Sequence, residues 1–219
     1  MQQMIDAMIY SIPYLMGGLG TTLLVSFLVV VLSLIAGVIL GVGLIYGPLP
    51  LRLLIRLLTD CIRGIPILVL IFAVYYGLPP LGLNLSSFWA AVLALTLFKT
   101  AQVIEYTRGA VTSIPRGQME AAMSIGLIFS QRLRYVIFPQ ATRRFLPPWL
   151  NGVTDAVKGS ALVSLLGVVD LMQAINQVIG RTYEPMPLYV LGALIYFAIN
   201  YSLSTTSKML EKRYAYIKE

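Results

Sequence analysis

The sequence of 219 residues contains no histidine and one cysteine, Cys61. Histidine is the side chain that most often acts as a general base or binds a metal, so its absence argues against both kinds of site. A single thiol cannot form a disulfide within the chain or a site with several cysteine ligands. The chain also offers no nucleophile paired with a base. We therefore expect no catalytic residue and no metal site, and we interpret Cys61 as a small apolar packing residue.

Charged residues are scarce as well. They make up 11% of the chain, against 58% hydrophobic residues, and the mean hydropathy of +0.83 is not typical of a soluble domain. No charged side chain occurs in residues 7–51, 64–98 or 185–207, and each tract can hold a membrane span of about 20 residues. Continuous apolar runs favour helices, because barrel strands alternate in polarity. The sequence thus predicts an all-α integral membrane protein.

Prolines divide the apolar tracts at the expected boundaries of the spans. The pairs are Pro48 with Pro50, Pro79 with Pro80, and Pro185 with Pro187. The resulting segmentation is five transmembrane helices, at about 19–46, 61–78, 88–109, 145–169 and 188–207. Residues 1–219 are expected to form a single transmembrane domain, since no linker or repeat is evident. The first basic residue is Arg52, so a cleavable signal peptide is not expected and the N-terminus is predicted to be retained.

Basic residues set the predicted orientation, because Lys and Arg concentrate in cytoplasmic loops. They cluster in alternate connections, whereas the segment before residue 52 and the 79–87 loop have none, and 170–187 has Arg181 alone. The clustered residues are Arg52, Arg56, Arg63, Arg116, Arg132, Arg134, Arg143, Arg144, Lys208, Lys212, Arg213 and Lys218. With five spans, the N-terminus lies outside and the C-terminus inside. The net charge of +7 is then a topology signal, and no nucleic-acid partner is expected.

The predicted cytoplasmic loop at 111–140 contains a polar, helix-forming stretch, EAAMSIGLIFSQRLRYVIFP, at 120–139. Ala122 and Gly126 lie one helical turn apart, which predicts a face poor in side chains that another protein could approach closely. Pro139 is expected to end the helical pattern. One interpretation is a docking surface. The alternative is an amphipathic helix among lipid headgroups, with Arg132 and Arg134 touching phosphate.

This stretch resembles the EAA loop of ATP-binding-cassette (ABC) importer permeases, and the resemblance covers most of the chain. Other segments are similar to the polar amino acid permeases of the histidine, arginine and glutamine type: RGIPIL at 63–68, SIPRGQ at 113–118 and PQA at 139–141. The individual matches are Glu105, Arg108, Gly109, Glu120, Ala121, Ala122, Gly126, Ile137, Pro139, Pro147, Asn151 and Lys158. In the resemblance, Glu120, Ala121, Ala122, Gly126 and Pro139 are the residues that couple to an ATPase.

The resemblance implies a type I ABC importer permease fold in a bacterial cytoplasmic (inner) membrane. It also implies several partners: a second permease subunit, identical or homologous, two cytoplasmic ATPase subunits, and an extracytoplasmic binding protein that delivers the amino acid. The chain lacks the Gly-x-x-x-x-Gly-Lys-Ser/Thr phosphate loop. No cofactor is therefore expected in this chain, and ATP and Mg belong to the partner ATPase. Opines or other small amino compounds are the alternative cargo.

Several ionisable residues fall at predicted membrane depth: Lys99, Glu105, Arg108, Asp155 and Lys158. A charge near the bilayer centre costs roughly 2.5 to 3.5 kcal/mol on the lenient insertion scale, so these groups should face protein or water. Glu105 with Arg108, and Asp155 with Lys158, are each three residues apart. Each couple could therefore be a local ion pair on one helix face.

The resemblance gives the alternative, in which these residues bind cargo. Lys158 would take the carboxylate of a zwitterionic amino acid and Glu105 its ammonium group, with Gln102, Arg108 and Ser160 completing the predicted substrate-binding set. The chain departs from the family here. Lys158-Gly159-Ser160-Ala161 lacks the acidic neighbour of relatives, and Gln102 stands where they often carry Tyr. Either the substrate differs, or this subunit lines the path while its partner holds the ligand.

Two other classes remain as rivals to the importer permease. A secondary amino acid transporter would be expected to show two related halves and more spans. A channel or assembly subunit would need no surface for an ATPase.

Overall fold

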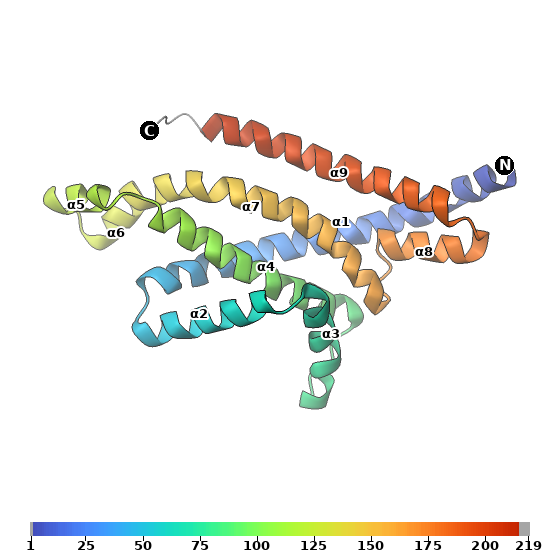
Figure 1. Ribbon diagram of the computed structural model, residues 1–219, viewed down its shortest axis with the longest axis horizontal. Helices are drawn as coiled ribbons and strands as arrows, with labels where there is room; N and C mark the ends of the chain where they lie inside the picture. The colour runs from blue at the N-terminus through green and yellow to red at the C-terminus, as the bar shows by residue number, and fades with distance from the viewer. Residues whose placement is uncertain (1, 215–219) are drawn as a thin grey trace.

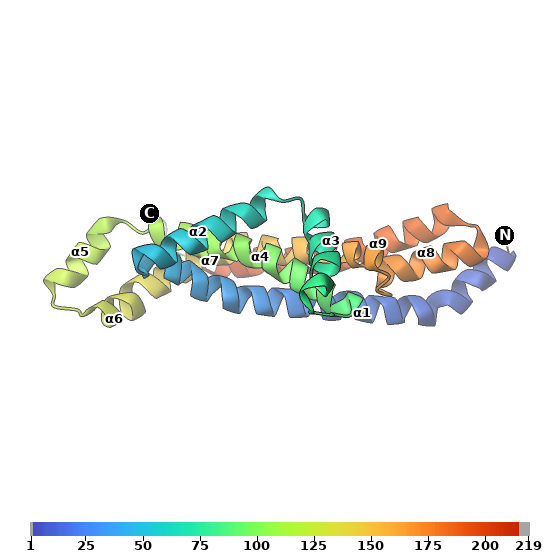
Figure 2. The same cartoon turned by 90° about the horizontal axis from the view of Figure 1, so that it is seen from below.

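The computed structural model describes residues 2–214, with side chains from residue 10 to residue 210. Every regular element among these residues is a helix, so the predicted all-α fold class is confirmed. The molecule is elongated, with α1, α7 and α9 running along its long axis (Figure 1). Seen from below, α5 and α6 project at one end, and α8 lies beside the start of α1 at the other (Figure 2). The basic residues Lys212, Arg213 and Lys218 lie outside the described side chains.

The long helix α1 (Gln2–Tyr46) forms the spine of the fold and packs mainly on α4 (Ser87–Thr112). The two helices approach closely because α1 presents glycines to α4. A Cβ atom added at Gly37 would lie 2.5 Å from the Val103 Cβ, and one added at Gly41 would lie 2.6 Å from the Thr107 Cβ. Buried valines and alanines of α1 and α4 extend this contact into the main apolar core. Close packing of small residues is the usual way in which membrane helices associate.

The predicted second span, 61–78, is not one helix. The structure has α2 (Leu49–Gly64) and α3 (Ile67–Gly77), which are bent by 107° with respect to each other. Ile65 between them is extended (φ −91°, ψ 130°), as expected for a residue that precedes a proline, here Pro66. The break is therefore explained by Pro66, whose effect does not appear in the hydropathy pattern.

The predicted fourth span, 145–169, is also composite. A helical rod begins with α6 (Phe129–Arg132), passes through the π-helical turn η2 (Leu133–Ile137), and continues as α7 (Phe138–Ser160) and the 3₁₀ segment η3 (Ala161–Leu166). After a bend of 50° comes α8 (Leu171–Thr182).

The start of α8 is fixed by two polar contacts. The Asp170 carboxylate accepts a hydrogen bond from the Gln173 backbone N–H (2.9 Å), as N-cap residues do. The Thr22 hydroxyl of α1 accepts one from the Leu171 N–H (3.0 Å). The first contact caps α8, and the second links α8 to α1.

The last helix, α9 (Pro185–Tyr214), packs on α7 and α8. Among the described residues, three helices are long and apolar enough to cross a membrane: 10–46, 87–112 and 185–210. The number rises to five if each bent pair is counted as one span. The fold therefore accommodates the five predicted spans, with two of them broken.

Candidate functional site

The projecting end of the molecule is built by α5 (Arg116–Ser124), the turn 125–128 and α6, which we name the tip. The chain reverses at Gly126, whose φ of +78° lies in the left-handed region that favours glycine. The N–H groups of Gly126 and Leu127 close the turn by donating to the Met123 and Ala122 carbonyls, at 2.9 and 3.1 Å. Residues 120–139 are therefore not one helix, and this correction changes which side chains face outward.

The predicted small face of Ala122 and Gly126 is wrong, because Gly126 lies outside α5 and Ala122 is buried. Glu120 and Ala121 are exposed, as a coupling role requires. The tip instead presents apolar side chains: Met123, Ile125 and Ile128 are 49%, 75% and 62% exposed. Sequence reasoning missed these three residues, although isolated isoleucines within a polar loop were a usable signal.

The tip is tied to the rest of the molecule through α7. The Arg144 guanidinium donates to the Ser113 carbonyl (2.5 Å), and the Gln140 amide donates to the Gln118 side chain (3.4 Å). A small buried apolar cluster lies beneath these contacts. Pro139 does not end the helix, contrary to prediction. It directly follows the π-helical turn η2, where the Phe138 N–H donates five residues back to the Leu133 carbonyl and the usual pattern of hydrogen bonds four residues back is already interrupted. The tip is thus joined to a continuous helical rod, which contains the π-helical turn η2 and the internal prolines Pro147 and Pro148.

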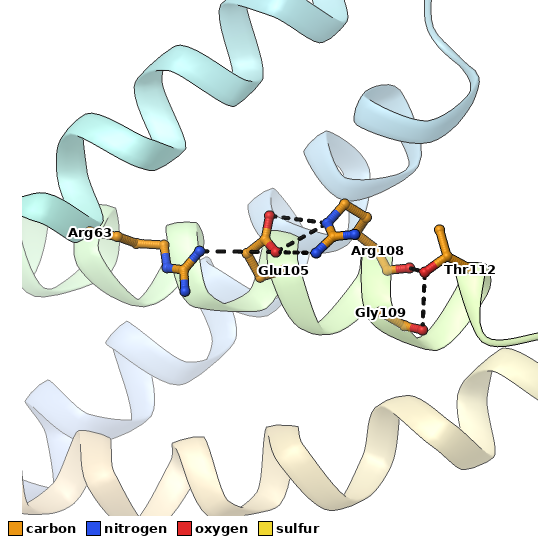
Figure 3. A network of polar contacts seen from close by, with 5 residues as sticks. All are labelled: Arg63, Glu105, Arg108, Gly109 and Thr112. Carbon is orange, nitrogen blue, oxygen red and sulfur yellow. Dashed lines mark hydrogen bonds and ion pairs between the residues drawn. The ribbon is translucent and has the colours of Figure 1, made fainter.

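The carboxylate of Glu105 forms a three-residue ion network on α4 (Figure 3). The Arg108 guanidinium donates to it through Nε (3.1 Å) and Nη2 (2.7 Å), both to Oε2. Arg63, in the last turn of α2, approaches the same oxygen with Nη1 at 3.9 Å. The local pair of Glu105 with Arg108 is confirmed, and the network also links α2 to α4.

The second local pair, Lys158 with Asp155, is confirmed too, with Nζ and Oδ1 3.4 Å apart. Both side chains are about 60% exposed although they lie on α7, within a helix of the membrane domain. They line a pocket of about 500 Å³ between α7 and α9, which we name the α7–α9 pocket. All of its lining residues except Phe197 carry a polar group: Asn151, Thr154, Asp155, Lys158, Phe197, Asn200, Tyr201 and Ser204.

The structure does not bring the five predicted substrate-binding residues together. Of these, Lys158 alone lines the α7–α9 pocket, whereas Glu105 and Arg108 pair with each other on α4. The Gln102 side chain accepts a hydrogen bond from the buried Lys99 ammonium (3.0 Å). Ser160 is buried, and its hydroxyl donates to the Val157 carbonyl (2.7 Å). Ligand roles for these residues stay predictions, and sequence reasoning missed the contribution of α9.

The α7–α9 pocket has the chemistry to recognise a small zwitterion. Lys158 supplies a cation and Asp155 an anion, while Asn151 and Asn200 supply amide groups. Asp155 also provides the acidic partner that is absent from the residues directly after Lys158. Charged groups at membrane depth need water or protein around them, so this open side of the pocket is not suited to face lipid.

The sequence of this chain is similar to those of known proteins. Residues 33–216 match the family described as "Binding-protein-dependent transport system inner membrane component". The chain is 37% identical over 212 residues to the probable amino-acid ABC transporter permease protein YckA of Bacillus subtilis (strain 168), covering 95% of this chain and 92% of that one. The probable glutamine ABC transporter permease protein GlnP of the same organism is 36% identical, with coverage of 92% and 94%.

Solved structures show the same similarity in three dimensions. The crystal structure of an amino acid ABC transporter with histidines superposes with a TM-score of 0.89 at 32% identity, covering 94% of this chain and 96% of that chain. The MetNI methionine ABC transporter, in an inward-facing conformation, superposes with a TM-score of 0.71 at 21% identity, covering 90% and 95%. The second likeness bears on the fold alone.

Proposed function

Because this chain belongs to the family of binding-protein-dependent transport system inner membrane components, we propose that it is the permease subunit of an ABC importer for a polar amino acid. One observation carries the proposal: a single helical rod joins two surfaces that each need a partner. The exposed apolar tip lies at the start of the rod, and the α7–α9 pocket lies along the second half of α7. An importer needs such a connection between the surface that binds the ATPase and the site that binds the substrate.

In this proposal the tip docks on a separate ATPase, and two such ATPase subunits serve two permease subunits. Ile125, Ile128 and Met123 would enter an apolar cleft of the ATPase, with Glu120 and Ala121 at the edge of the contact. ATP and Mg stay on the ATPase, and this chain performs no chemistry. The exposure of large apolar side chains at a loop end supports docking, because such groups gain most from burial in a complex.

The α7–α9 pocket is proposed to contact the amino acid. Lys158 would bind its carboxylate, Asp155 its ammonium group, and the amides of Asn151 and Asn200 a polar side chain. A second permease subunit, identical or homologous, would close the open side of the pocket. Support comes from the exposure of Lys158 and Asp155 in the single chain, since a charged pair of this kind does not face lipid.

The proposed orientation places the tip in the cytoplasm of a bacterial cell and the N-terminus outside. The basic residues Arg116, Arg132, Arg134 and Arg144 all lie in or beside the tip, which the positive-inside rule assigns to the cytoplasm. The binding protein would then dock at the opposite end, near α8. A tag at the N-terminus should be reached from outside, and a tag after residue 219 from the cytoplasm.

The test is ATP-driven uptake by the complex in proteoliposomes, with radiolabelled amino acids and the cognate binding protein. Ile125→Asp should abolish both uptake and retention of the ATPase during purification. Leu81→Asp is a matched control, since Ile125 and Leu81 are equally exposed, at 75%, and Leu81 lies in η1 (Pro79–Leu81), away from the tip. Equal ATPase retention in the two variants would contradict the docking assignment. Uptake driven by an ion gradient without ATP would instead indicate a secondary transporter.

A further inference from the structure

An apolar groove with a volume of about 520 Å³ runs between α1, α4 and the start of α7. On α1 its lining extends from Leu34 to Tyr46, and on the helical rod from Leu133 to Phe145. The groove is separate from the α7–α9 pocket and shares no lining residue with it. It lies at the end of the membrane domain from which the tip projects.

The groove offers almost nothing to a polar ligand. Its two threonine hydroxyls are used within their own helices: Thr107 donates to the Val103 carbonyl (2.9 Å) and Thr142 to the Phe138 carbonyl (2.8 Å). Apart from Tyr46, all the other lining side chains are aliphatic or phenylalanine. Its occupant must therefore be hydrocarbon over most of the length.

The length of the groove matches one leaflet of a bilayer. The rise from Leu34 to Tyr46 on α1 is about 18 Å at 1.5 Å per residue. Half of a hydrocarbon core of about 30 Å is about 15 Å. A single acyl chain lying along α1 would run from the middle of the membrane to its surface.

The end of the groove nearest the tip carries an aromatic and cationic cluster. The ring of Tyr46 meets the ring of Phe129 edge to face, with centroids 5.3 Å apart. The Arg132 guanidinium lies over the other ring of this pair, 5.9 Å from the Phe129 centroid. Its Nε is buried and has no hydrogen-bond partner among the residues that the structure describes. A buried donor without an acceptor is costly. The Arg132 side chain is partly exposed as a whole, so its guanidinium would gain from an anionic or carbonyl oxygen placed beside it.

We propose that the groove binds an anionic phospholipid from the leaflet on the side of the tip. One acyl chain fills the groove and the phosphate pairs with Arg132. The exposed Tyr135, with the Arg134 guanidinium 5.7 Å from its ring centroid, lies one turn further along the rod and is suited to the same headgroup level. The bound lipid would brace the junction between α1 and the base of the tip.

A helix from a second copy of this chain fits the groove less well. The long apolar helices available for such packing are α1 and α9. The apolar stretches of these helices, residues 7–46 and 185–207, contain no acidic side chain that could pair with Arg132, and the acidic residues of α1 and α9, Asp6 and Glu211, belong to their terminal turns. Charge complementarity therefore favours the phospholipid.

Native mass spectrometry of the purified complex, with phosphatidylglycerol and phosphatidylcholine as probes, tests the proposal. The wild-type complex should bind phosphatidylglycerol in preference to phosphatidylcholine. Arg132→Gln should reduce the preference by about tenfold, as expected when a charge-assisted hydrogen bond is lost. It should weaken phosphatidylcholine binding less, because the choline cation of that lipid already offsets the charge of its phosphate. Val38→Trp, which fills the groove, should reduce the binding of both lipids.

Arg181→Gln is the matched control, because Arg181 also lies over an aromatic ring, that of Tyr14 at 5.7 Å, but at the opposite end of the molecule. It should leave the preference unchanged. An equal preference in wild type and Arg132→Gln would overturn the proposal. So would a change of subunit stoichiometry in Val38→Trp with lipid binding intact, which would identify the groove as a contact between copies.

Discussion

The tip and the α7–α9 pocket expose opposite kinds of side chain. The tip exposes apolar side chains outside the membrane helices, and the pocket exposes charged side chains on a membrane helix. At the tip, which projects beyond the membrane helices, large apolar side chains are exposed, and Ile125 is the most exposed of them. In the pocket, on a helix of the membrane domain, Lys158 and Asp155 are open and charged. Each surface becomes favourable only when something covers it. This mismatch between side chain and surroundings is what supports both contacts of the proposed importer.

The sharpest test of the pocket is the removal of its cation. Lys158→Met should lower ATP-driven uptake by tenfold or more, because a charge-assisted hydrogen bond to the amino acid is worth about 1.5–3 kcal/mol. ATPase retention and basal ATP hydrolysis should persist, since Lys158 lies far along the rod from the tip. Lys158→Arg, which keeps the charge, serves as the control. Normal uptake by Lys158→Met would remove this residue from the cargo contacts.

A second test concerns the shape of the tip. Gly126→Leu forces a bulky side chain into the left-handed region at φ +78°, which costs about 1–2 kcal/mol. ATPase retention should fall by roughly fivefold to thirtyfold, and uptake should fall with it while the protein still inserts. Gly126→Asn is the matched control, because asparagine tolerates this conformation. If both variants retained the ATPase equally, the turn would not position the docking residues.

The smallest effect is expected at Glu105, which belongs to neither surface. Glu105→Gln breaks the ion pairs with Arg63 and Arg108, and partly exposed pairs of this kind contribute about 0.2–1 kcal/mol each. The thermal stability of the complex should fall slightly, and uptake should change by less than about threefold. Arg63→Gln, measured in parallel, should produce a smaller thermal shift, because it removes only the longer contact of 3.9 Å and leaves the pair of Glu105 with Arg108. A tenfold loss of uptake in Glu105→Gln alone would place this carboxylate among the cargo contacts.

Much of the fold could be predicted from the sequence because charge-free tracts mark helices directly. The end of α1 at Tyr46 and the extent of α4 agree with the expected spans to within a few residues. The breaks could not be predicted from hydropathy, since Gly64–Pro66 and the turn at Gly126 are local backbone events within tracts of otherwise uniform character. The local ion pairs were predictable because they depend on spacing within one helix.

The candidate site was harder to predict because its walls come from distant parts of the chain. Lys158 was identified from the resemblance, but Asn200 and Tyr201 approach it only because α9 packs against α7. The packing of α9 against α7 is a tertiary contact, and no short sequence pattern predicts it. Ser160 illustrates the converse, since its helix turns the side chain inward to bond the Val157 carbonyl, away from the pocket. Position in a motif therefore predicts the neighbourhood of a residue and not the direction in which it points.

The π-helical turn η2 gives the proposed importer a mechanical property. It lies between the tip and α7, and the Phe138 N–H donates to the Leu133 carbonyl five residues back. Helices bend most sharply at such turns. When the ATPase moves the tip, part of that motion would be absorbed by a change of angle at residues 133–137. The rest would be passed on to α7, which is about 35 Å long at 1.5 Å per residue. The motion that reaches Lys158 would depend on this turn and also on Pro147 and Pro148, which lie within α7 between the turn and Lys158.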